Sequence, residues 1–440
     1  MSKNIRILAQ YYDKKTGEAM EELVLHDEEV IKAQTLKGLG YLHREQIEIL
    51  QQIQDFKIKY QMLLTSTATC PKCAKKTRRN GVFSSKFHAA LTDHKAQMQR
   101  VGCQCGWKSA SSIEGMYGSS MHPDLLEKQA MQGSQMSYEK TSKSLNAESA
   151  SKRAINSHSQ IYKSVQLVSE PLETIRSSSA EVIKEVAHSL VASIDGGHIK
   201  SRGDKRSFEA MIATVYRPEN LKYVDKHHNV ISSKSTVASA KDDDQKTMKL
   251  LFKNACTMQG MSSETTVTCL ADGAENCQTI AYSIKNHCKN IIYILDWFHI
   301  AMKFKNIKKH EKYVDLLAKV KWHLWHGDPD TAISRLGSLK ALISDSAVVA
   351  KLEKLSSYIY NNRRGIVNYG DRQAKGLVFT SNLAESTVNS LINERQKGKQ
   401  KMAWSRDGAH HVLQIRASIY SNSWQEDWKQ VEQVLYKQAA

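Results

Sequence analysis

Three apolar segments in the second half of the chain each end in an aspartate. They are Ser189–Asp195, Thr265–Asp272 and Asn290–Asp296, and each has the length and composition of a short buried strand. In an open α/β sheet, a carboxylate at the carboxyl end of a strand projects into the crevice where ligands bind. Several such carboxylates repel one another and are stabilised by hard cations such as Mg²⁺. The pattern therefore predicts an α/β core with an acidic, cation-binding edge.

Further strand and helix candidates extend this core. The charged stretch 300–375 has a helical pattern, as does the C-terminal block that begins at Ser381 and contains Glu385. The remaining candidates are strands at 208–223 and 230–238 and a helix at 242–258. We therefore expect a catalytic core in two parts, 187–300 and 376–440, separated by a helical insertion over 301–375.

Asp195, Asp272 and Glu385 are the candidate metal ligands. Paired metal ions activate the attacking oxygen and stabilise the leaving oxygen in phosphodiester chemistry, including attack by a DNA 3′-hydroxyl. Each acid also has a structural alternative, since Asp195 and Asp272 precede glycines and Asp296 precedes a predicted helix. Glu385 closes the capping-box pattern Asn382-Leu-Ala-Glu385. Their joint occurrence in one chain favours the catalytic interpretation.

The balance of charge indicates a polyanionic partner. The chain has 440 residues, 41% of them hydrophobic, and a formal net charge of +18. Lys and Arg set against phosphates release condensed counterions, so nucleic acid is favoured over a basic protein without such a partner. No apolar run approaches the ~20 residues that span a bilayer, and the first residues lack the apolar core of a secretory signal. We therefore expect a cytoplasmic, nucleoid-associated protein with reduced thiols and no membrane partner.

Four of the eight cysteines form two closely spaced pairs: Cys70, Cys73, Cys103 and Cys105. Four thiolates on two tight turns provide the tetrahedral ligands that structural zinc requires. The spacing of the second pair is short, so His88 or His94 could replace one thiolate, and buried cysteines without a metal are the alternative. The sequence predicts a zinc ribbon over 66–112.

Two helical modules are expected beside the zinc ribbon. Residues 1–65 are predicted to form a largely helical arm that serves dimerisation, DNA binding or packing. Within 120–180, Met136–Asn146 and Ser149–Lys163 have the size of two short helices joined by a tight turn, as in a helix-turn-helix domain. An ordinary amphipathic helix pair is the alternative. The candidate DNA-binding residues near the start of the second helix are Lys152 and Arg153.

Clustered cations flank the predicted Glu385 helix on both sides. Together with one aromatic residue they suit a phosphate track with base stacking, and a solvated basic face is the alternative. The candidate DNA-binding residues of this cluster are Arg363, Arg364, Arg395, Lys397, Lys399, Lys401, Trp404 and Arg406.

The C-terminal motif and the acidic motifs together resemble a known family. The run from Ser381 to Ser405 resembles bacterial insertion-sequence transposases of the ISKra type, which are related to Mutator-like and ISL-type transposases. The resemblance covers about 190–417, and the first acidic motif departs from it at His198. The acidic motifs that are similar to those of the family are Ser193-Ile-Asp195-Gly196-Gly197, Leu270-Ala-Asp272-Gly273 and Leu295-Asp296-Trp-Phe298-His299.

The resemblance implies a DDE transposase with an RNase H-like fold, whose mixed sheet is interrupted by the helical insertion. It implies that Asp195, Asp272 and Glu385 hold two Mg²⁺ or Mn²⁺ ions for cutting and joining DNA, and that Asp296 and His299 support this site. The implied partners are double-stranded DNA, as transposon ends and target, and further copies of the chain in a dimer or higher oligomer. A domesticated DNA-binding protein without activity and an RNase H-like nuclease that only hydrolyses are the alternatives.

Overall fold

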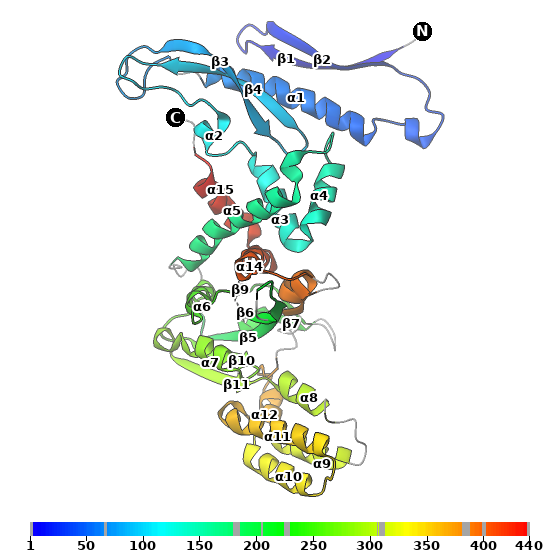
Figure 1. Cartoon of the computed structure of the whole chain (residues 1–440), viewed down its shortest axis with the longest axis vertical. Coiled ribbons are helices and arrows are strands. Elements are labelled where there is room, and N and C mark those ends of the chain that lie inside the picture. The colour runs from blue at the N-terminus through cyan, green and yellow to red at the C-terminus, as the bar shows by residue number, and fades with distance from the viewer. Residues whose placement is uncertain are drawn as a thin grey trace. The chain divides into compact units, whose positions relative to one another are not determined.

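Two compact units make up the chain (Figure 1). Unit 1 comprises Met1–Val168 and Trp428–Ala440, and unit 2 comprises Ser169–Asp427. No described helix combines the length and the apolar composition that a bilayer span requires. The structure is a computed structural model and describes residues 3–65, 68–178, 185–203, 206–223, 229–305, 307, 313–380, 388–397 and 402–437.

Unit 1 begins with a β-hairpin rather than a helix. β1 (Asn4–Tyr12) pairs antiparallel with β2 (Ala19–Glu29), and the 3₁₀ turn η1 (Leu36–Gly38) precedes α1 (His43–Leu64). Side chains at alternate positions of β1 are partly buried, which is the period of a strand. Tyr11 of β1 stacks on Tyr60 of α1 with ring centroids 3.7 Å apart. The prediction of a helical arm over 1–65 is therefore wrong for the β1–β2 hairpin and correct for α1.

A second hairpin carries the four cysteines. β3 (Arg78–His88) pairs antiparallel with β4 (Asp93–Gly102), and one cysteine pair lies just before β3 while the other lies just after β4. On one face of this hairpin, Ala96 and Met98 pack against α1. The short helix α2 (Ile113–Tyr117) joins the same small core through Ile113.

Helices complete unit 1, and their positions differ from the predicted helix-turn-helix. Its second helix was expected from Ser149, but a turn and the 3₁₀ segment η2 separate α4 from α5, so Lys152 and Arg153 precede α5. Most of α15 also belongs to unit 1, whereas α5 contributes to both units. These elements are α3 (Pro123–Gln135), α4 (Tyr138–Ala147), η2 (Ala154–Asn156), α5 (His158–Ser177) and α15 (Trp424–Leu435).

Unit 2 contains a five-stranded mixed sheet with the order β11-β10-β5-β6-β9. Strands β5, β10 and β11 are parallel, β6 is antiparallel to β5, and β9 is antiparallel to β6. The strands are β5 (Ser189–Lys200), β6 (Ser207–Tyr216), β9 (Ser235–Ser239), β10 (Thr266–Ala271) and β11 (Asn290–Leu295), with a separate small hairpin of β7 (Leu221–Tyr223) and β8 (Asn229–Ile231). The predicted mixed α/β core is confirmed.

Two apolar cores lie against this sheet. In one, α6 (Lys246–Met258) and α7 (Glu275–Tyr282) pack with Ala192, Ile194 and Val267 of the sheet. In the other, Val191, Leu270 and Ile294 pack with the helices that follow β11. Successive side chains of a strand point to opposite faces, so the apolar runs of β5 and β10 supply both cores at once.

The segment predicted as a helical insertion is helical in its described residues. Tyr369 from this segment is fully buried and donates a hydrogen bond to the carbonyl oxygen of Leu295 at 2.7 Å, which ties the helices to the end of β11. The helices from β11 onward are α8 (Trp297–Lys305), α9 (Val314–Trp325), α10 (Pro329–Ala341), α11 (Ser346–Asn361), α12 (Tyr369–Ala374), the π-helix η7 (Asn389–Lys397) and α14 (Arg406–Tyr420). Of these, α14 contacts the edge strand β9, where Gln414 donates to the carbonyl oxygen of Ala238 at 2.8 Å.

Candidate active site

Asp195, Asp272 and Asp296 occupy the same level on three adjacent parallel strands. Each directly follows one residue of a paired row, and that row consists of Ile194 in β5, Ala271 in β10 and Leu295 in β11. The strands therefore bring the three aspartates of the sequence motifs together. One detail differs from the prediction, because β5 continues to Lys200 and Asp195 lies within the strand rather than at its end.

One carboxylate oxygen of each aspartate accepts a backbone hydrogen bond from a residue just after it. The donors are the N–H groups of Gly196 to Asp195 at 2.7 Å, of Ala274 to Asp272 at 2.8 Å and of Phe298 to Asp296 at 3.0 Å. The capping role considered as an alternative is thus present for Asp296, whereas Asp195 lies within β5 and Asp272 accepts its bond just before α7. A carboxylate has two oxygens, so a side chain that accepts one backbone hydrogen bond can also bind a cation.

The three carboxylates and His299 form one electrostatic group. Asp296 is fully buried, and its Oδ2 lies 3.7 Å from Nε2 of His299. Burial raises the pKa of Asp195 to about 6; Asp272 and Asp296 act in the same direction, while His299 and the N–H of Gly196 oppose them. Carboxylates that are partly buried and repel one another provide the hard oxygen ligands that Mg²⁺ and Mn²⁺ prefer.

Asp195→Asn is expected to stabilise the metal-free chain at pH 8. Because the folded pKa of Asp195 lies above its ordinary value of 3.8, its contribution to stability is present below that value and is lost as the pH rises through about 6. Removing the charge should raise the free energy of unfolding at pH 8 by on the order of 2 kcal/mol, with no gain near pH 3.8. Thermal unfolding at the two pH values, without divalent metal, measures this difference. A gain that is equal at both would contradict the assignment.

Three residues that the sequence reading missed adjoin these aspartates: Glu209 of β6 and Asn276 and Cys277 of α7. Asn276 donates to Oε2 of Glu209 at 2.7 Å. Oε1 of Glu209 would lie only 2.5 Å from a Cβ atom at Gly196, so this glycine leaves room for the carboxylate. Burial raises the pKa of the Cys277 thiol well above its ordinary value, and Asp272 and Asp195 raise it further. The one sequence signal for this close approach was the Gly196-Gly197 pair, but two glycines after an aspartate are also typical of a turn.

The third predicted metal ligand, Glu385, lies outside the described residues, as do Lys399 and Lys401. The description resumes at Val388. A Cβ atom at Gly197 would lie 3.4 Å from Val388 and 2.5 Å from Ile392, so η7 packs directly on β5 two residues beyond Asp195.

The remaining basic candidates fall into an exposed and a buried group. Lys152, Arg363, Arg364 and Lys397 are exposed. Arg406 is partly buried, where it donates to the carbonyl oxygen of Ala240 at 3.0 Å and lies 3.5 Å from a carboxylate oxygen of Asp242. Arg395 and Trp404 are buried and pack on each other, with the guanidinium carbon 4.7 Å from the ring centroid. The DNA contact expected of Arg395 and Trp404 is therefore replaced by a packing role, since neither side chain reaches solvent.

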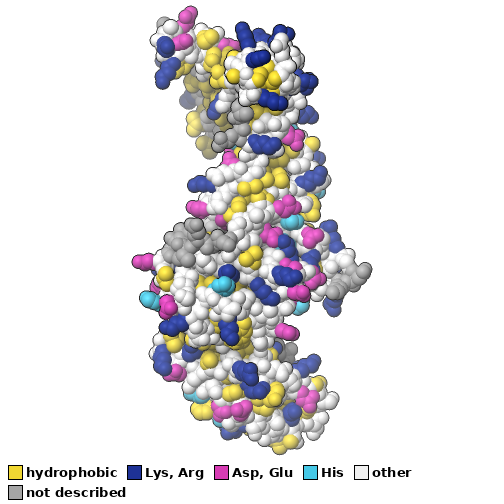
Figure 2. All heavy atoms as spheres, turned by 90° about the vertical axis from the view of Figure 1, so that its left-hand side faces the viewer, with side chains coloured by type: hydrophobic (Ala, Val, Ile, Leu, Met, Phe, Trp, Pro, Cys, Tyr) yellow, Lys and Arg dark blue, Asp and Glu magenta, His cyan; other side chains and the backbone are white. Residues whose placement is uncertain are grey.

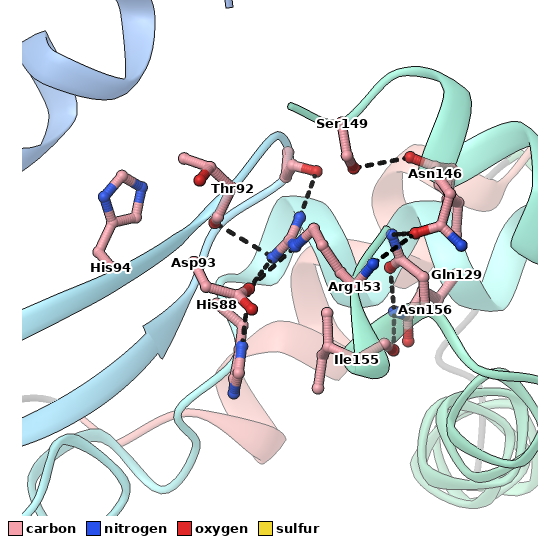
Figure 3. A network of polar contacts seen from close by, with 12 residues as sticks. His88, Thr92, Asp93, His94, Gln129, Asn146, Ser149, Arg153, Ile155 and Asn156 are labelled. Carbon is pink, nitrogen blue, oxygen red and sulfur yellow. Dashed lines mark hydrogen bonds and ion pairs between the residues drawn. The ribbon is translucent and has the colours of Figure 1, made fainter. Parts of the chain in front are cut away.

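Arg153 is buried as well, although a DNA contact was expected (Figure 3). Its Nε donates to Oδ1 of Asp93 at 2.9 Å, and its two terminal nitrogens donate to the carbonyl oxygens of Ala90 and Thr92 at 3.0 and 3.1 Å. Burial raises the pKa of Asp93, but the hydrogen bonds from His88 and Arg153 outweigh this effect and hold the pKa below its ordinary value. Arg153 thus fastens the turn between β3 and β4 to the segment between α4 and α5.

Arg153→Met is expected to destabilise the chain by about 2–3 kcal/mol, because it leaves two carbonyl oxygens without their donor and Asp93 with His88 alone. Lys152→Met removes the same charge from an exposed neighbour and should change stability by less than about 0.5 kcal/mol. Urea unfolding of both variants measures the difference. Equal stability of the two variants, with weaker DNA binding by Arg153→Met alone, would restore the original DNA-contact prediction.

The predicted four-cysteine cluster is confirmed. The sulfur atoms of all four residues lie within 4.8 Å of one another, and two of the pairs are closer, Cys70 to Cys105 at 3.6 Å and Cys73 to Cys103 at 3.5 Å. Thiolates about 2.3 Å from one tetrahedral zinc ion lie about 3.8 Å apart, so this cluster could bind a structural zinc. The two histidine alternatives have other partners.

Those partners are carboxylates: Nδ1 of His88 lies 2.9 Å from Asp93, and Nδ1 of His94 lies 2.6 Å from Asp55. The two cysteine turns are alike. The N–H of Cys70 donates to the carbonyl oxygen of Lys75 and the N–H of Cys103 to that of Trp107, both at 2.8 Å. Each turn thus closes on itself, and the two turns bring the four sulfur atoms together into one cluster.

Comparison with known proteins gives one family. No curated protein matches the chain. The model of a family described as "Uncharacterised protein family (UPF0236)" matches residues 119–434, which span all of unit 2 but begin after the four cysteines. The chain belongs to this uncharacterised family, UPF0236.

Proposed function

We propose that this chain is a DNA transposase of the DDE type with an RNase H-like core in unit 2. The observation that carries the proposal is the placement of Asp195, Asp272 and Asp296 at one level of three adjacent parallel strands. The mixed sheet and the helices that follow β11 support the fold that the sequence resemblance implies. The net charge of +18 supports a polyanionic substrate.

Glu385 completes the proposed ligand set. Val388 and Ile392 pack on Gly197, which brings the start of η7 beside the strand that carries Asp195. Glu385 precedes Val388 by three residues, and the proposal includes it in the ligand set on the strength of the sequence motif. Asp195, Asp272 and Glu385 would then offer hard oxygen ligands from two strands and one helical segment.

The proposed chemistry assigns a separate task to each side chain. Bound divalent ions would activate the attacking oxygen and stabilise the leaving one. Asp195, Asp272 and Glu385 would bind and orient these ions. The backbone hydrogen bonds that Asp195 and Asp272 accept would fix the orientation of their carboxylates. Nε2 of His299 lies 3.7 Å from Oδ2 of buried Asp296, and His299 acts against the rise in the pKa of Asp195, so both residues are proposed to support the site. Exposed Arg363, Arg364 and Lys397 are proposed to contact DNA phosphates.

The deciding experiment incubates the full chain with Mg²⁺ or Mn²⁺ and a duplex carrying the DNA that flanks its gene. Cleavage at a terminal repeat followed by joining of the 3′ end to a second duplex supports the proposal. Cleavage without joining would replace it with a nuclease, and binding without cleavage would replace it with a DNA-binding protein that lacks activity. Size-exclusion chromatography with the paired ends tests the proposed dimer or higher oligomer.

A further inference from the structure

The four-cysteine hairpin carries exposed positive charge that the proposed active site does not use. Residues 68–112 contain nine Lys and Arg residues, all of them exposed, and one acidic residue. No ion pair joins any of the nine to a carboxylate in the described part of the chain. The single acid, Asp93, is already bound to Arg153 and His88. Figure 2 shows Lys and Arg side chains gathered over the upper part of unit 1.

The two faces of this hairpin have different tasks. The inner face, which includes Ala96 and Met98, packs against α1. The outer face presents cross-strand pairs of exposed polar side chains, Ser84 with Gln97 and Lys86 with Lys95. Because successive side chains alternate between faces, the exposed part of the outer row is polar or basic apart from Val82, and Val101 at the end of the row is buried. The exposed part of the outer face is therefore a two-stranded ribbon that carries hydrogen-bonding groups.

The Lys86–Lys95 pair costs stability in the chain alone. Like charges directly opposite each other on neighbouring strands repel and destabilise the pairing. An anion bound between them would remove this cost. A membrane surface is disfavoured, because binding there also needs an apolar face to enter the lipid, and this face offers one exposed valine. The charge and the absence of local counter-charge favour a nucleic acid.

We propose that the outer face of the β3–β4 hairpin binds double-stranded DNA in the major groove. The major groove of B-form DNA admits a two-stranded β-ribbon, and lysine and glutamine side chains have donors suited to guanine and adenine edges there. Lys86, Lys95 and Gln97 face the bases, and Arg79, which pairs with Val101 of the same row near the cysteine turns, contacts phosphate. This surface deepens the proposed function, on which it rests for the choice of DNA as partner.

Lys86→Glu is the sharpest test, because a variant that loses only the DNA contact keeps its melting temperature. A variant whose fold is damaged would lose melting temperature and DNA affinity together. The change replaces a repelling cross-strand pair with an attracting one, so the melting temperature should stay equal or rise. DNA affinity of the full chain should nevertheless fall by on the order of tenfold, and the slope of log affinity against log salt should decrease by about one. Lys95→Gln, which removes the repulsion without adding a negative charge, should weaken binding less.

The matched control is Lys14→Glu, which makes the same charge change at an exposed lysine in the turn between β1 and β2. Its DNA affinity should remain within about twofold of the parent. Binding is measured without divalent cations, so that cleavage does not contribute, and without chelator, so that the cysteine cluster keeps any bound metal. Equal losses in Lys14→Glu and Lys86→Glu, or no loss in Lys86→Glu, would overturn the proposal.

A duplex RNA of the same sequence separates groove binding from general attraction to phosphates. The major groove of A-form RNA is too deep and narrow for side chains to read, so this RNA should compete at least tenfold less well than the DNA duplex. Equal competition would overturn the major-groove assignment. Intact binding by the parent chain together with absent cleavage would count against the proposed transposase activity alone, and the two ideas can therefore fail separately.

Discussion

Asp272→Asn is expected to lower metal-dependent DNA cleavage by about a thousandfold or more while leaving the chain folded. Asparagine keeps the oxygen that accepts the N–H of Ala274, so the turn into α7 is retained. It removes the negative charge beside Asp195. Ligation of catalytic ions supplies several kcal/mol of transition-state stabilisation, and each 1.4 kcal/mol corresponds to tenfold in rate. Cleavage of a labelled duplex with Mn²⁺ and the melting temperature of the variant measure the two effects.

Glu275→Gln is the matched control for this prediction. Glu275 is an exposed carboxylate in the first turn of α7, three residues beyond Asp272, and the substitution changes the charge by the same amount. Cleavage should stay within about twofold, because an exposed charge in water acts only weakly at that distance. Undiminished cleavage by Asp272→Asn would remove this residue from the site. Equal losses in both variants would show that charge at the start of α7, rather than ligation, governs activity.

The three parallel strands, the aspartates that follow their apolar runs and the cysteine pairs could be predicted, because each is specified by a short stretch of sequence. β5, β10 and β11 have apolar side chains on both faces, so each appears in the sequence as a largely apolar run that is followed by an aspartate. Parallel pairing aligns the ends of such runs, and the strand pattern alone therefore indicates that Asp272 and Asp296 lie together. The two close cysteine pairs are equally local, since their spacing alone specifies two turns.

Features that depend on distant partners could not be predicted in this way. Arg153 follows a helix and looks like a phosphate contact, but its carboxylate partner, Asp93, is 60 residues earlier in the chain. In the sequence, nothing distinguishes Glu209 from other polar residues of a strand. Its position beside Gly196 results from the pairing of β6 with β5, in which Glu209 lies opposite His198. The first hairpin was missed because its strands carry many charged residues, and the partly buried rows become evident only when α1 covers them.

Cys103→Ser is expected to abolish zinc binding by the chain and to unfold the β3–β4 hairpin. The strands of the hairpin have few buried apolar side chains, namely Val101 together with Ala96 and Met98, which pack against α1. Zinc binding contributes apparent free energies of about 10–16 kcal/mol in zinc-finger peptides, far more than so small a core provides. Zinc content per chain, and the rate of proteolysis within 68–112, are the two measurements.

Cys288→Ser controls for the loss of a thiol outside the cluster. Cys288 is partly buried in unit 2 and donates to the carbonyl oxygen of Ile284, a hydrogen bond that serine can also make. This variant should keep one zinc per chain and the parent's resistance to proteolysis. If Cys103→Ser also kept its zinc, the fourth thiolate would not be needed and the metal would have another ligand. If it lost zinc and remained resistant, the contacts with α1 alone would hold the hairpin, and the cluster would be a metal site without a role in folding.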